Sequence, residues 1–171
     1  MSSEGSNTPV LRVSSDEFRR ASGRFATGIT IATVRDSEGQ PHGLTVNSFT
    51  SVSLEPPLVS ICLGHAVKLI DRFREATHYG INMLADSQKN LSVQFAMRGH
   101  DRFEGVDWAP GPHGAPLIAG VLAALECRIV ERIPAGDHDI FLAELETAQI
   151  TDGQPLIYFA SEYRQLGNER P

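Results

Sequence analysis

Short polar side chains gather in one strand-like segment, GLTVNSFTSVSLEPP, at residues 43–57. Hydroxyl or amide groups lie at Thr45, Asn47, Ser48, Thr50, Ser51 and Ser53. Such groups, together with accessible backbone N–H donors, suit a neutral site for a phosphate or for the edge of a heterocycle. A polar outer strand face is the alternative that needs no ligand. Because Ser48, Phe49 and Thr50 break strict alternation, we favour ligand binding at this segment.

A second candidate is Gly136-Asp137-His138, which separates two long segments of alternating apolar and polar residues. Glycine permits a tight turn there. An imidazole that directly follows a carboxylate at a loop edge either caps the turn or contacts a ligand. On the residues alone, capping is the simpler interpretation.

Basic side chains supply a third candidate, in a loop-like segment at residues 98–116 that is longer than a compact domain usually contains. Its first part carries Arg98, His100, Arg102 and Phe103. Taken separately these residues fit a solvated loop, but together with Lys68 they are the only basic groups that we would direct at an anionic cofactor. Composition alone fits a binding loop and a disordered connector equally well.

Several motifs that carry well-known chemistry are absent. The sequence has no GxxxxGK[ST], no GxGxxG after a strand, no HExxH and no GxSxG, which excludes the usual P-loop, Rossmann, zincin and α/β-hydrolase signals. The 6 histidines show no i,i+4 pairing with one another or with a cysteine. A metal site would therefore have to be assembled wholly by tertiary contact, and we expect no metal.

Length and charge narrow the class of protein further. The 171 residues fit one domain, and a net charge of -6 disfavours nucleic acid and anionic membranes as partners. Cys62 and Cys127 lie far apart in apolar runs, which predicts buried thiols in a reducing compartment. The first eight residues, MSSEGSNT, lack the basic and apolar regions of a signal peptide, so we expect a disordered tail at 1–13 and a cytoplasmic protein.

The elements that must position these residues follow from hydrophobic periodicity. Helices are predicted at 16–26 behind Ser14 and Ser15, at 66–76, and from Asp86 to Gly99; strands are predicted at 27–35, 43–53, 58–64, 79–85, 122–133, 138–150 and 156–166. Pro56 and Pro57 end the second strand. About six to seven strands with hairpin-like connections predict an antiparallel β-barrel with helices outside it, in a single domain at 14–167 followed by a tail at 168–171.

The sequence also resembles the short-chain flavin reductases that serve two-component flavin-dependent monooxygenases. The resemblance rests on FATGITIATV, GLTVNSFTSVSLEPPLVSICL, GINMLA with QFA, RF followed by VDW, APLI, LECRI and GDHDIFLAELE. These segments span residues 15–166, nearly the whole chain. The resemblance implies an FMN-binding split barrel, built as a homodimer with flavin sites near the interface, which agrees with the predicted barrel.

Site residues are implied by the same resemblance. The flavin-contacting strand of the family matches Thr45, Val46, Asn47, Ser48, Phe49, Thr50 and Ser51. The ring edge is expected at Val46, Asn47 and Ser48, and phosphate or ribityl oxygens at Thr50 and Ser51. Residues on neighbouring strands or flanking the flavin tail match Thr30, Cys62, Gly64, Lys68, Phe95, Ala96, Arg98, Arg102 and Phe103. His138, beside Asp137, matches the residue near the nicotinamide.

Two departures from the family pattern affect these assignments. Ala143-Glu144-Leu145 stands where relatives usually have Gly-Glu-Val. This difference slightly narrows the side of the expected site that would hold the nicotinamide. His65-Ala66-Val67 follows the CLG segment in place of small hydroxylated residues, which weakens the assignment of contacts to the flavin tail.

The function implied is an NAD(P)H-dependent flavin reductase, with FMN or FAD as flavin and NADH favoured over NADPH. Hydride passes from the nicotinamide to flavin N5, and reduced flavin diffuses to a separate monooxygenase. Because the cofactors carry this chemistry, His138 would orient the nicotinamide without transferring a proton. The alternatives are a non-catalytic flavin- or haem-binding split-barrel protein and an enzyme like pyridoxine phosphate oxidase. The latter would need more converging basic side chains than this acidic chain offers.

Overall fold

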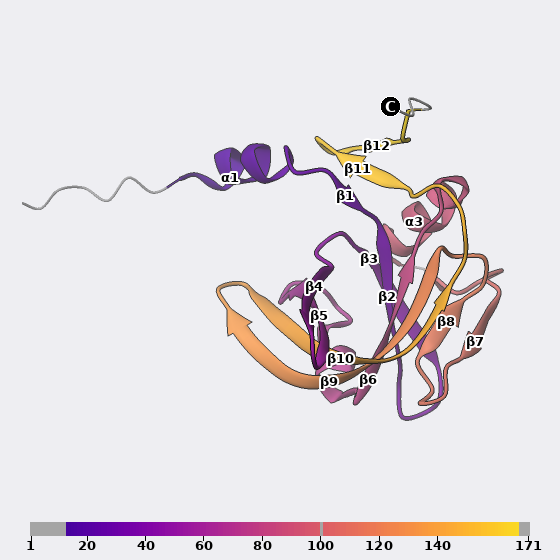
Figure 1. The fold of residues 1–171 in the computed structure, drawn as a ribbon. Coiled ribbons are helices and arrows are strands. Elements are labelled where there is room, and N and C mark those ends of the chain that lie inside the picture. Colours follow the sequence, from indigo (N-terminus) through magenta and orange to yellow (C-terminus); the bar gives the residue numbers. More distant parts are fainter. Residues whose placement is uncertain (1–12, 100, 168–171) are drawn as a thin grey trace, which may run out of the picture.

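The computed structural model describes residues 13–99 and 101–167. Its main body is a seven-stranded antiparallel sheet, ordered β3-β2-β6-β9-β10-β5-β4, which curls strongly on itself (Figure 1). The strands are β2 (Thr30–Arg35), β3 (Pro41–Val46), β4 (Thr50–Leu54), β5 (Pro57–Gly64), β6 (His78–Met83), β9 (Ala123–Ala135) and β10 (His138–Ile150). The mainly β, antiparallel class predicted from the sequence is confirmed.

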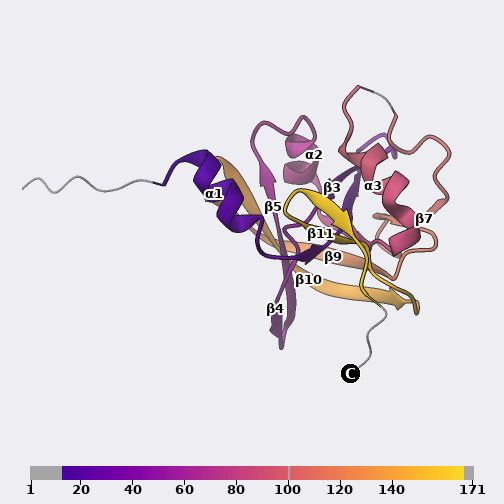
Figure 2. The ribbon, with the colours of Figure 1, turned by 90° about the horizontal axis from the view of Figure 1, so that it is seen from above.

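The smaller elements surround this sheet. A three-stranded sheet contains β1 (Thr27–Gly28), β11 (Ile157–Phe159) and β12 (Glu162–Arg164), and a hairpin contains β7 (Trp108–Pro110) and β8 (Pro116–Ile118). The helical segments are α1 (Ser15–Ser22), α2 (Ile70–Glu75), the 3₁₀ turn η1 (Asp86–Gln88) and α3 (Lys89–Ala96). Seen from above, α1 lies at the periphery, where the described chain begins (Figure 2). Within the described ranges, no helix is long and apolar enough to cross a membrane.

The curl of the sheet follows from the short link between its two edge strands. Strands β3 and β4 are at opposite edges, yet only residues 47–49 separate them in the chain. Four backbone steps from Val46 to Thr50 span at most about 14 Å. In a flat sheet, seven strands spaced by about 4.8 Å would place the edges about 29 Å apart. The sheet must therefore roll until its edges approach each other.

Two hydrophobic clusters fill the fold. The first contains Phe73, Tyr79 and Phe141, all completely buried, and joins α2 to the inner face of the curled sheet. The second contains Phe95 and Phe103 and lies where α3 and β8 cover the sheet. These clusters explain the alternating strand patterns, because every second side chain enters a cluster.

The helices are shorter than their sequence patterns predict. Helix α1 begins as expected, with Ser14 and Glu17 forming a reciprocal capping box, but it ends at Ser22 before Gly23. It buries no residue, so the apolar face predicted for it has nothing to cover in this chain. The helix predicted to start behind an Asp86 cap instead opens with η1, in which Gln88 accepts from the backbone of Ala85. Its last turn, in α3, ends before Gly99.

Three of the predicted strands are not continuous in the structure. The strand expected at 27–35 divides, because β1 pairs with β11 while β2 joins the main sheet. The strand expected at 43–53 divides at residues 47–49, since its halves pair at opposite sheet edges. The strand expected at 156–166 is a hairpin, which turns at Ala160 and Ser161 with positive φ values of 50° and 65°.

Other expectations hold. The predicted hairpin of β9 and β10 turns at Gly136, whose φ is 65°, and β4 ends before Pro56 and Pro57. The loop expected at 98–116 contains the short strand β7 and the start of β8. Both cysteines are free; Cys127 is buried as predicted, whereas Cys62 is half-buried. The expected tails at 1–13 and 168–171 lie, apart from Val13, outside the described residues.

Candidate functional site

The polar segment straddles the gap between the two edges of the curled sheet. Thr45 is the last residue but one of β3, residues 47–49 cross over, and Thr50 and Ser51 begin β4 with exposed side chains. The Thr45 hydroxyl donates to the Ser92 carbonyl of α3 over 2.6 Å, so this hydroxyl is already engaged. The three backbone N–H groups of residues 47–49 have no acceptor among the described residues.

Beside these donors lies the outward face of β5. Ser60, Cys62 and Gly64 are half-buried and alternate with the fully or nearly buried Val59, Ile61 and Leu63. Burial raises the pKa of the Cys62 thiol, which keeps it a neutral, weakly polar S–H group. A flat face of small side chains next to free N–H donors can accept an aromatic ring.

His138 stands at the end of this face. In the sheet register it pairs with Gly64 of β5 and with Ala135 of β9. A Cβ on Gly64 would lie 3.3 Å from His138 Nε2, so the glycine leaves room for the imidazole. Asp137 Oδ1 lies 2.7 Å from His138 Nδ1, and this hydrogen bond lowers the pKa of Asp137. With Nδ1 engaged, Nε2 remains the atom that can meet a ligand.

A second layer of ionic contacts supports the same end of the sheet. Asp139 is buried, and its carboxylate bonds His65 Nε2 over 2.9 Å and accepts from Arg74 Nε over 2.8 Å. These hydrogen bonds, from His65 first and Arg74 second, lower the pKa of Asp139. The backbone N–H of His65 also donates to the Asp137 carbonyl. The loop after β5 is thereby tied to the turn that carries His138.

A cleft of about 880 Å³ opens where this loop meets residues 98–99 and 101–103; His100, which the sequence groups with them, lies outside the described residues. It gathers Lys68, Arg98, Arg102 and Phe103, four residues that the sequence assigns to flavin binding. Arg102 is held in place, since its guanidinium donates to the carbonyls of Met97 and Gly43 over 2.9 and 2.7 Å. Burial, followed by the charge of Arg98, lowers the pKa of Arg102. Three cationic residues and one acidic residue, Asp101, thus line one cavity large enough for a small ligand.

Some residues that the sequence assigns to flavin binding are buried and support the fold. Thr30 is buried and donates to the Val46 carbonyl over 3.0 Å. Phe95 is completely buried and packs edge-to-face on Phe103, whose ring is also largely buried. Val46 is buried too, Phe49 is half-buried, and Ala96 is exposed at the end of α3. Any contact of Thr30 or Phe95 with a ligand must therefore be indirect.

Sequence reasoning did not assign the other walls of the cleft. They include Gln40, Pro41 and His42 of the first hairpin, and Trp108 of β7. Only the lone tryptophan in the long loop gave a signal that could have indicated a wall. The remaining wall residues come together through tertiary packing, which their spacing in the chain does not reveal.

The comparisons with known proteins decide the family. The family described as "Flavin reductase like domain" matches residues 22–167, most of the chain. The chain belongs to the flavin reductase-like family. This membership places the free N–H donors, the His138 turn and the basic cleft in the domain that the family shares.

Individual relatives of this flavin reductase-like chain carry more specific names. An NADH-dependent flavin reductase from a Rhodococcus species is 40% identical over 161 residues, covering 90% of this chain and 89% of its own. The reductase component of a 4-nitrophenol 4-monooxygenase/4-nitrocatechol 2-monooxygenase from Rhodococcus opacus is 39% identical, covering 86% and 78%. The solved NADH:FAD oxidoreductase of Streptomyces globisporus, in complex with NAD and FAD fragments, is 39% identical with a TM-score of 0.86, covering 91% and 94%.

Proposed function

We propose that this protein is an NADH-dependent flavin reductase that supplies reduced flavin to a separate monooxygenase. The single observation that carries the proposal is the run of free backbone N–H donors at residues 47–49 beside the outward face of β5 and His138. The names of its relatives, which include NADH-dependent flavin reductases and reductase components of monooxygenases, support the same activity.

The residues present fit a flavin ring. The N–H donors of residues 47–49 match the acceptor atoms along the polar edge of an isoalloxazine. Gly64 and Cys62 offer a low surface on which a planar ring can lie, because neither projects a bulky side chain. Bound flavin supplies hydride-accepting chemistry, which no side chain of the protein could replace.

The cleft fits the anionic end of the cofactor. Lys68, Arg98 and Arg102 provide positive charge in an otherwise acidic protein, and Lys68 follows the ring-binding face by only four residues. Thr50 and Ser51, which the family resemblance assigns to the phosphate, pair with Ser60 and Val59 farther back along β5. We therefore place the phosphate in the cleft and not at Thr50 and Ser51.

His138 fits the role of orienting the nicotinamide. Its Nδ1 is held by Asp137, and its half-exposed ring lies at the open end of the ring-binding face. An imidazole fixed in this way can position a second ring by a hydrogen bond from or to Nε2. No proton transfer by His138 is needed, because hydride transfer between the two cofactors is complete without one.

A homodimeric split barrel is the assembly that we propose. Helix α1 buries nothing in this chain, while Phe18 and Phe25 are 65% and 78% exposed. Apolar surface of this kind gains stability when a partner covers it. A second copy of the chain is the partner that we propose, with the flavin near the interface. The free thiols of Cys62 and Cys127 fit a cytoplasmic location.

The decisive experiment is steady-state oxidation of NADH with FMN, FAD or riboflavin at equal concentration. At least one flavin should accelerate NADH consumption well above the rate in buffer. If every flavin leaves the rate unchanged although flavin fluorescence shows binding, the protein is a binding protein and the proposal fails. Oxidation of pyridoxine 5′-phosphate with oxygen in place of NADH oxidation would instead favour the oxidase alternative.

A further inference from the structure

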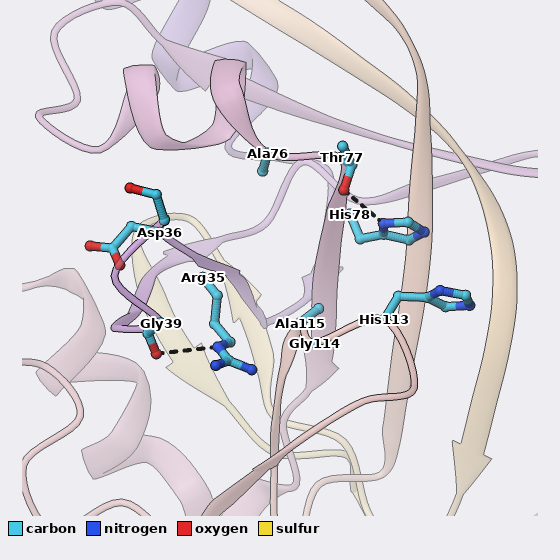
Figure 3. Close-up of a pocket in the computed structure, with 10 residues that line it drawn as sticks. Arg35, Asp36, Gly39, Ala76, Thr77, His78, His113, Gly114 and Ala115 are labelled. Atoms are coloured by element: carbon cyan, nitrogen blue, oxygen red, sulfur yellow. Dashed lines mark hydrogen bonds between the residues drawn. The ribbon is translucent and has the colours of Figure 1, made fainter.

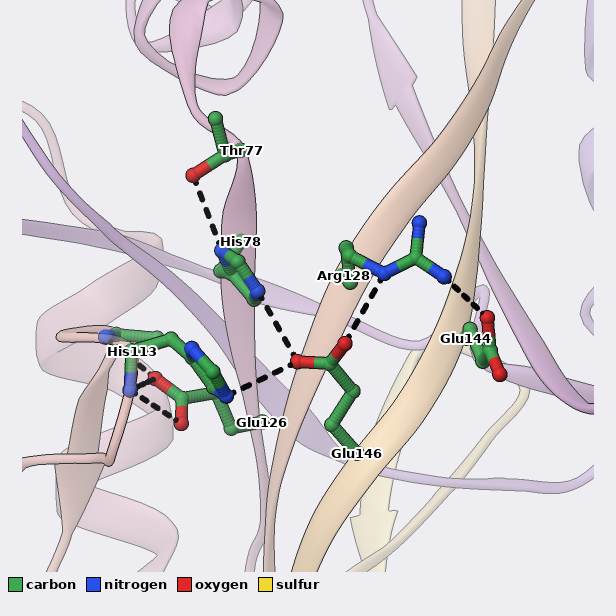
Figure 4. A network of polar contacts seen from close by, with 8 residues as sticks. Thr77, His78, His113, Glu126, Arg128, Glu144 and Glu146 are labelled. Atoms are coloured by element: carbon green, nitrogen blue, oxygen red, sulfur yellow. Dashed lines mark hydrogen bonds and ion pairs between the residues drawn. The ribbon is translucent and has the colours of Figure 1, made fainter.

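Two histidines and a glutamate that lie far apart in the sequence meet on the surface formed by β6, β10 and the loop before β8 (Figure 4). Oε2 of Glu146 lies 3.1 Å from Nε2 of His78 and 3.2 Å from Nε2 of His113. The two imidazoles are stacked, with ring centroids 4.6 Å apart and an interplanar angle of 3°. Three atoms that can bind a metal therefore point into the same small space.

The spacing of these atoms matches the ligand shell of a small divalent ion. Around tetrahedral zinc, with bonds of about 2.0–2.2 Å to nitrogen and oxygen, neighbouring ligand atoms lie about 3.3–3.5 Å apart. The distances from Glu146 to the two histidines are only slightly shorter, and the three ligand atoms all lie within 4.8 Å of one another. An ion lies near the plane of each imidazole that binds it, so the two stacked rings would also have to turn about their side-chain torsions to admit the ion.

The remaining polar atoms of these ligands are already held by neighbours. The Thr77 hydroxyl lies 3.0 Å from His78 Nδ1, which leaves Nε2 to face Glu146. Nε of Arg128 donates to Oε1 of Glu146 over 3.0 Å, which leaves Oε2 for an ion. Partners of this kind orient the ligands at metal sites in proteins.

The backbone that carries the ligands is also fixed. The buried carboxylate of Glu126 accepts from the backbone N–H groups of His113 and Ala115, the shortest contact being 2.8 Å. A Cβ on Gly111 would lie 2.7 Å from this carboxylate, so the loop can approach it only with glycine there. Glu146 lies at a register irregularity of β10, a feature that re-aims side chains.

A pocket of about 290 Å³ has His78 and His113 at its edge (Figure 3). Its lining includes Arg35, Thr77, His78, His113 and Gly114. The pocket is open to solvent, so a water molecule can complete the coordination of an ion held by three protein ligands.

We propose that His78, His113 and Glu146 form a binding site for one divalent transition-metal ion, with zinc as its representative. The site is separate from the flavin site, because Glu146 follows His138 by eight strand residues, or more than about 20 Å along β10. The ion would link the loop before β8 to β6 and β10, and so oppose their separation. Neutral imidazoles and the carboxylate supply ligands without any rearrangement of the sheet.

The test uses the untagged full-length protein, freed of metal by a chelator and dialysed, with zinc chloride as the only ligand. Calorimetric titration should show one zinc ion per chain with a dissociation constant at or below about 10 μM. Cobalt(II) in place of zinc should give the intense visible absorption of a four-coordinate site. His113→Ala and Glu146→Gln should each weaken zinc binding at least tenfold.

Glu144→Gln is the matched control, because Glu144 contacts the same Arg128 from the same strand but lies outside the three-ligand group. It should leave zinc affinity within twofold, and circular dichroism should show that all variants fold. Absence of saturable binding up to 1 mM zinc would reduce the cluster to an ion-pair network and overturn the proposal. Tight binding that survives both His113→Ala and Glu146→Gln would overturn it as well.

Discussion

On the β4 side of β5, the side chain of Ser48 hydrogen-bonds the backbone of Cys62 as a residue of a neighbouring strand would. Its hydroxyl donates to the Cys62 carbonyl and accepts from the Cys62 N–H, each over 3.0 Å. The ladder between β4 and β5 reaches Thr50 and Ser60, so the Ser48 side chain continues the pairing one step beyond the last backbone pair. Because the side chain does this, the backbone N–H of Ser48 stays available to a ligand.

Ser48→Ala should therefore weaken both the fold and flavin binding. Two hydrogen bonds at about 0.5–1.5 kcal/mol each predict a loss of about 1–3 kcal/mol in the free energy of unfolding. Urea titration measures this loss, and fluorescence quenching measures flavin affinity. Ser51→Ala is the control, since Ser51 is exposed on β4. Equal effects of the two substitutions would contradict the role given to Ser48.

His138→Ala should raise the KM for NADH more than the dissociation constant of the flavin. Loss of one positioning contact of about 1–3 kcal/mol corresponds to about a 5- to 150-fold increase. Steady-state kinetics at saturating flavin, with flavin titrations alongside, separate the two effects. If flavin binding weakens while the KM for NADH stays constant, the flavin ring and not the nicotinamide ring lies beside His138.

Removal of the charges of Lys68 and Arg98 together by alanine should weaken FMN and FAD about tenfold or more, while riboflavin affinity stays the same. Charge-assisted hydrogen bonds to a phosphate contribute about 1.5–3 kcal/mol, and riboflavin has no phosphate. The matched pair is Thr50→Ala with Ser51→Ala, which should affect the three flavins alike. A selective loss of FMN and FAD in this second variant would move the phosphate to β4.

The lowered pKa of Asp36 predicts that the fold loses stability in acid. Hydrogen bonds from His42 first, and from the backbone of Gln40 next, lower the pKa of Asp36 from its ordinary 3.8 to about 2. A carboxyl with a lowered pKa in the folded state contributes stability above about pH 4, and this stability is lost as pH falls towards 2. Urea midpoints of wild type and Asp36→Asn should therefore differ most at pH 5, and the difference should shrink as pH falls from 4 towards 2.

His42→Ala sharpens this experiment, because it removes the largest cause of the shift and leaves the carboxyl in place. Its stability should begin to fall at a higher pH than that of the wild type. A difference between wild type and Asp36→Asn that stays constant from pH 5 to 2.5 would show that Asp36 does not titrate with folding.

Phe18→Glu should disrupt the proposed dimer. The phenylalanine is 65% exposed on α1, so a charge there harms the isolated chain little but opposes burial against a second copy. The molar mass measured by light scattering should fall from twice the 18.6 kDa chain mass towards 18.6 kDa itself. Arg20→Glu on the same helix is the control and should remain dimeric. A wild-type mass of one chain in active protein would end the dimer proposal.

Local patterns sufficed for the elements whose pairing is local. The hairpin of β9 and β10 was predictable because two alternating segments flank Gly136, which adopts the positive φ that the turn requires. The start of α1 was predictable from its cap. In contrast, the break at residues 47–49 is set by the rolling of the sheet. The sequence marks it only by a lapse in alternation at Ser48, Phe49 and Thr50, which does not reveal that the two halves pair at opposite edges.

The residues of the candidate site also fall into those that local sequence patterns indicate and those that only tertiary packing brings together. The polar segment and His138 could be found from sequence, since each is a contiguous motif. Lys68 and Arg98 could also be singled out, as basic residues, but the walls of the cleft made by Gln40, Pro41 and His42 could not. The first hairpin meets the two basic residues only through tertiary packing. The same reason hid the meeting of His78 with Glu146, which lie on β6 and β10 with the single strand β9 between them and a bulge at Glu146.

The link at residues 47–49 fixes the circumference of the rolled sheet by a covalent tether. One extra residue there would lengthen the tether by about 3.5 Å without changing the register of any strand or the composition of either hydrophobic cluster. The width of the seam between β3 and β4 can therefore vary while the rest of the architecture stays constant. Loop length at this single point is a means by which chains of this architecture can adapt to ligands of different size.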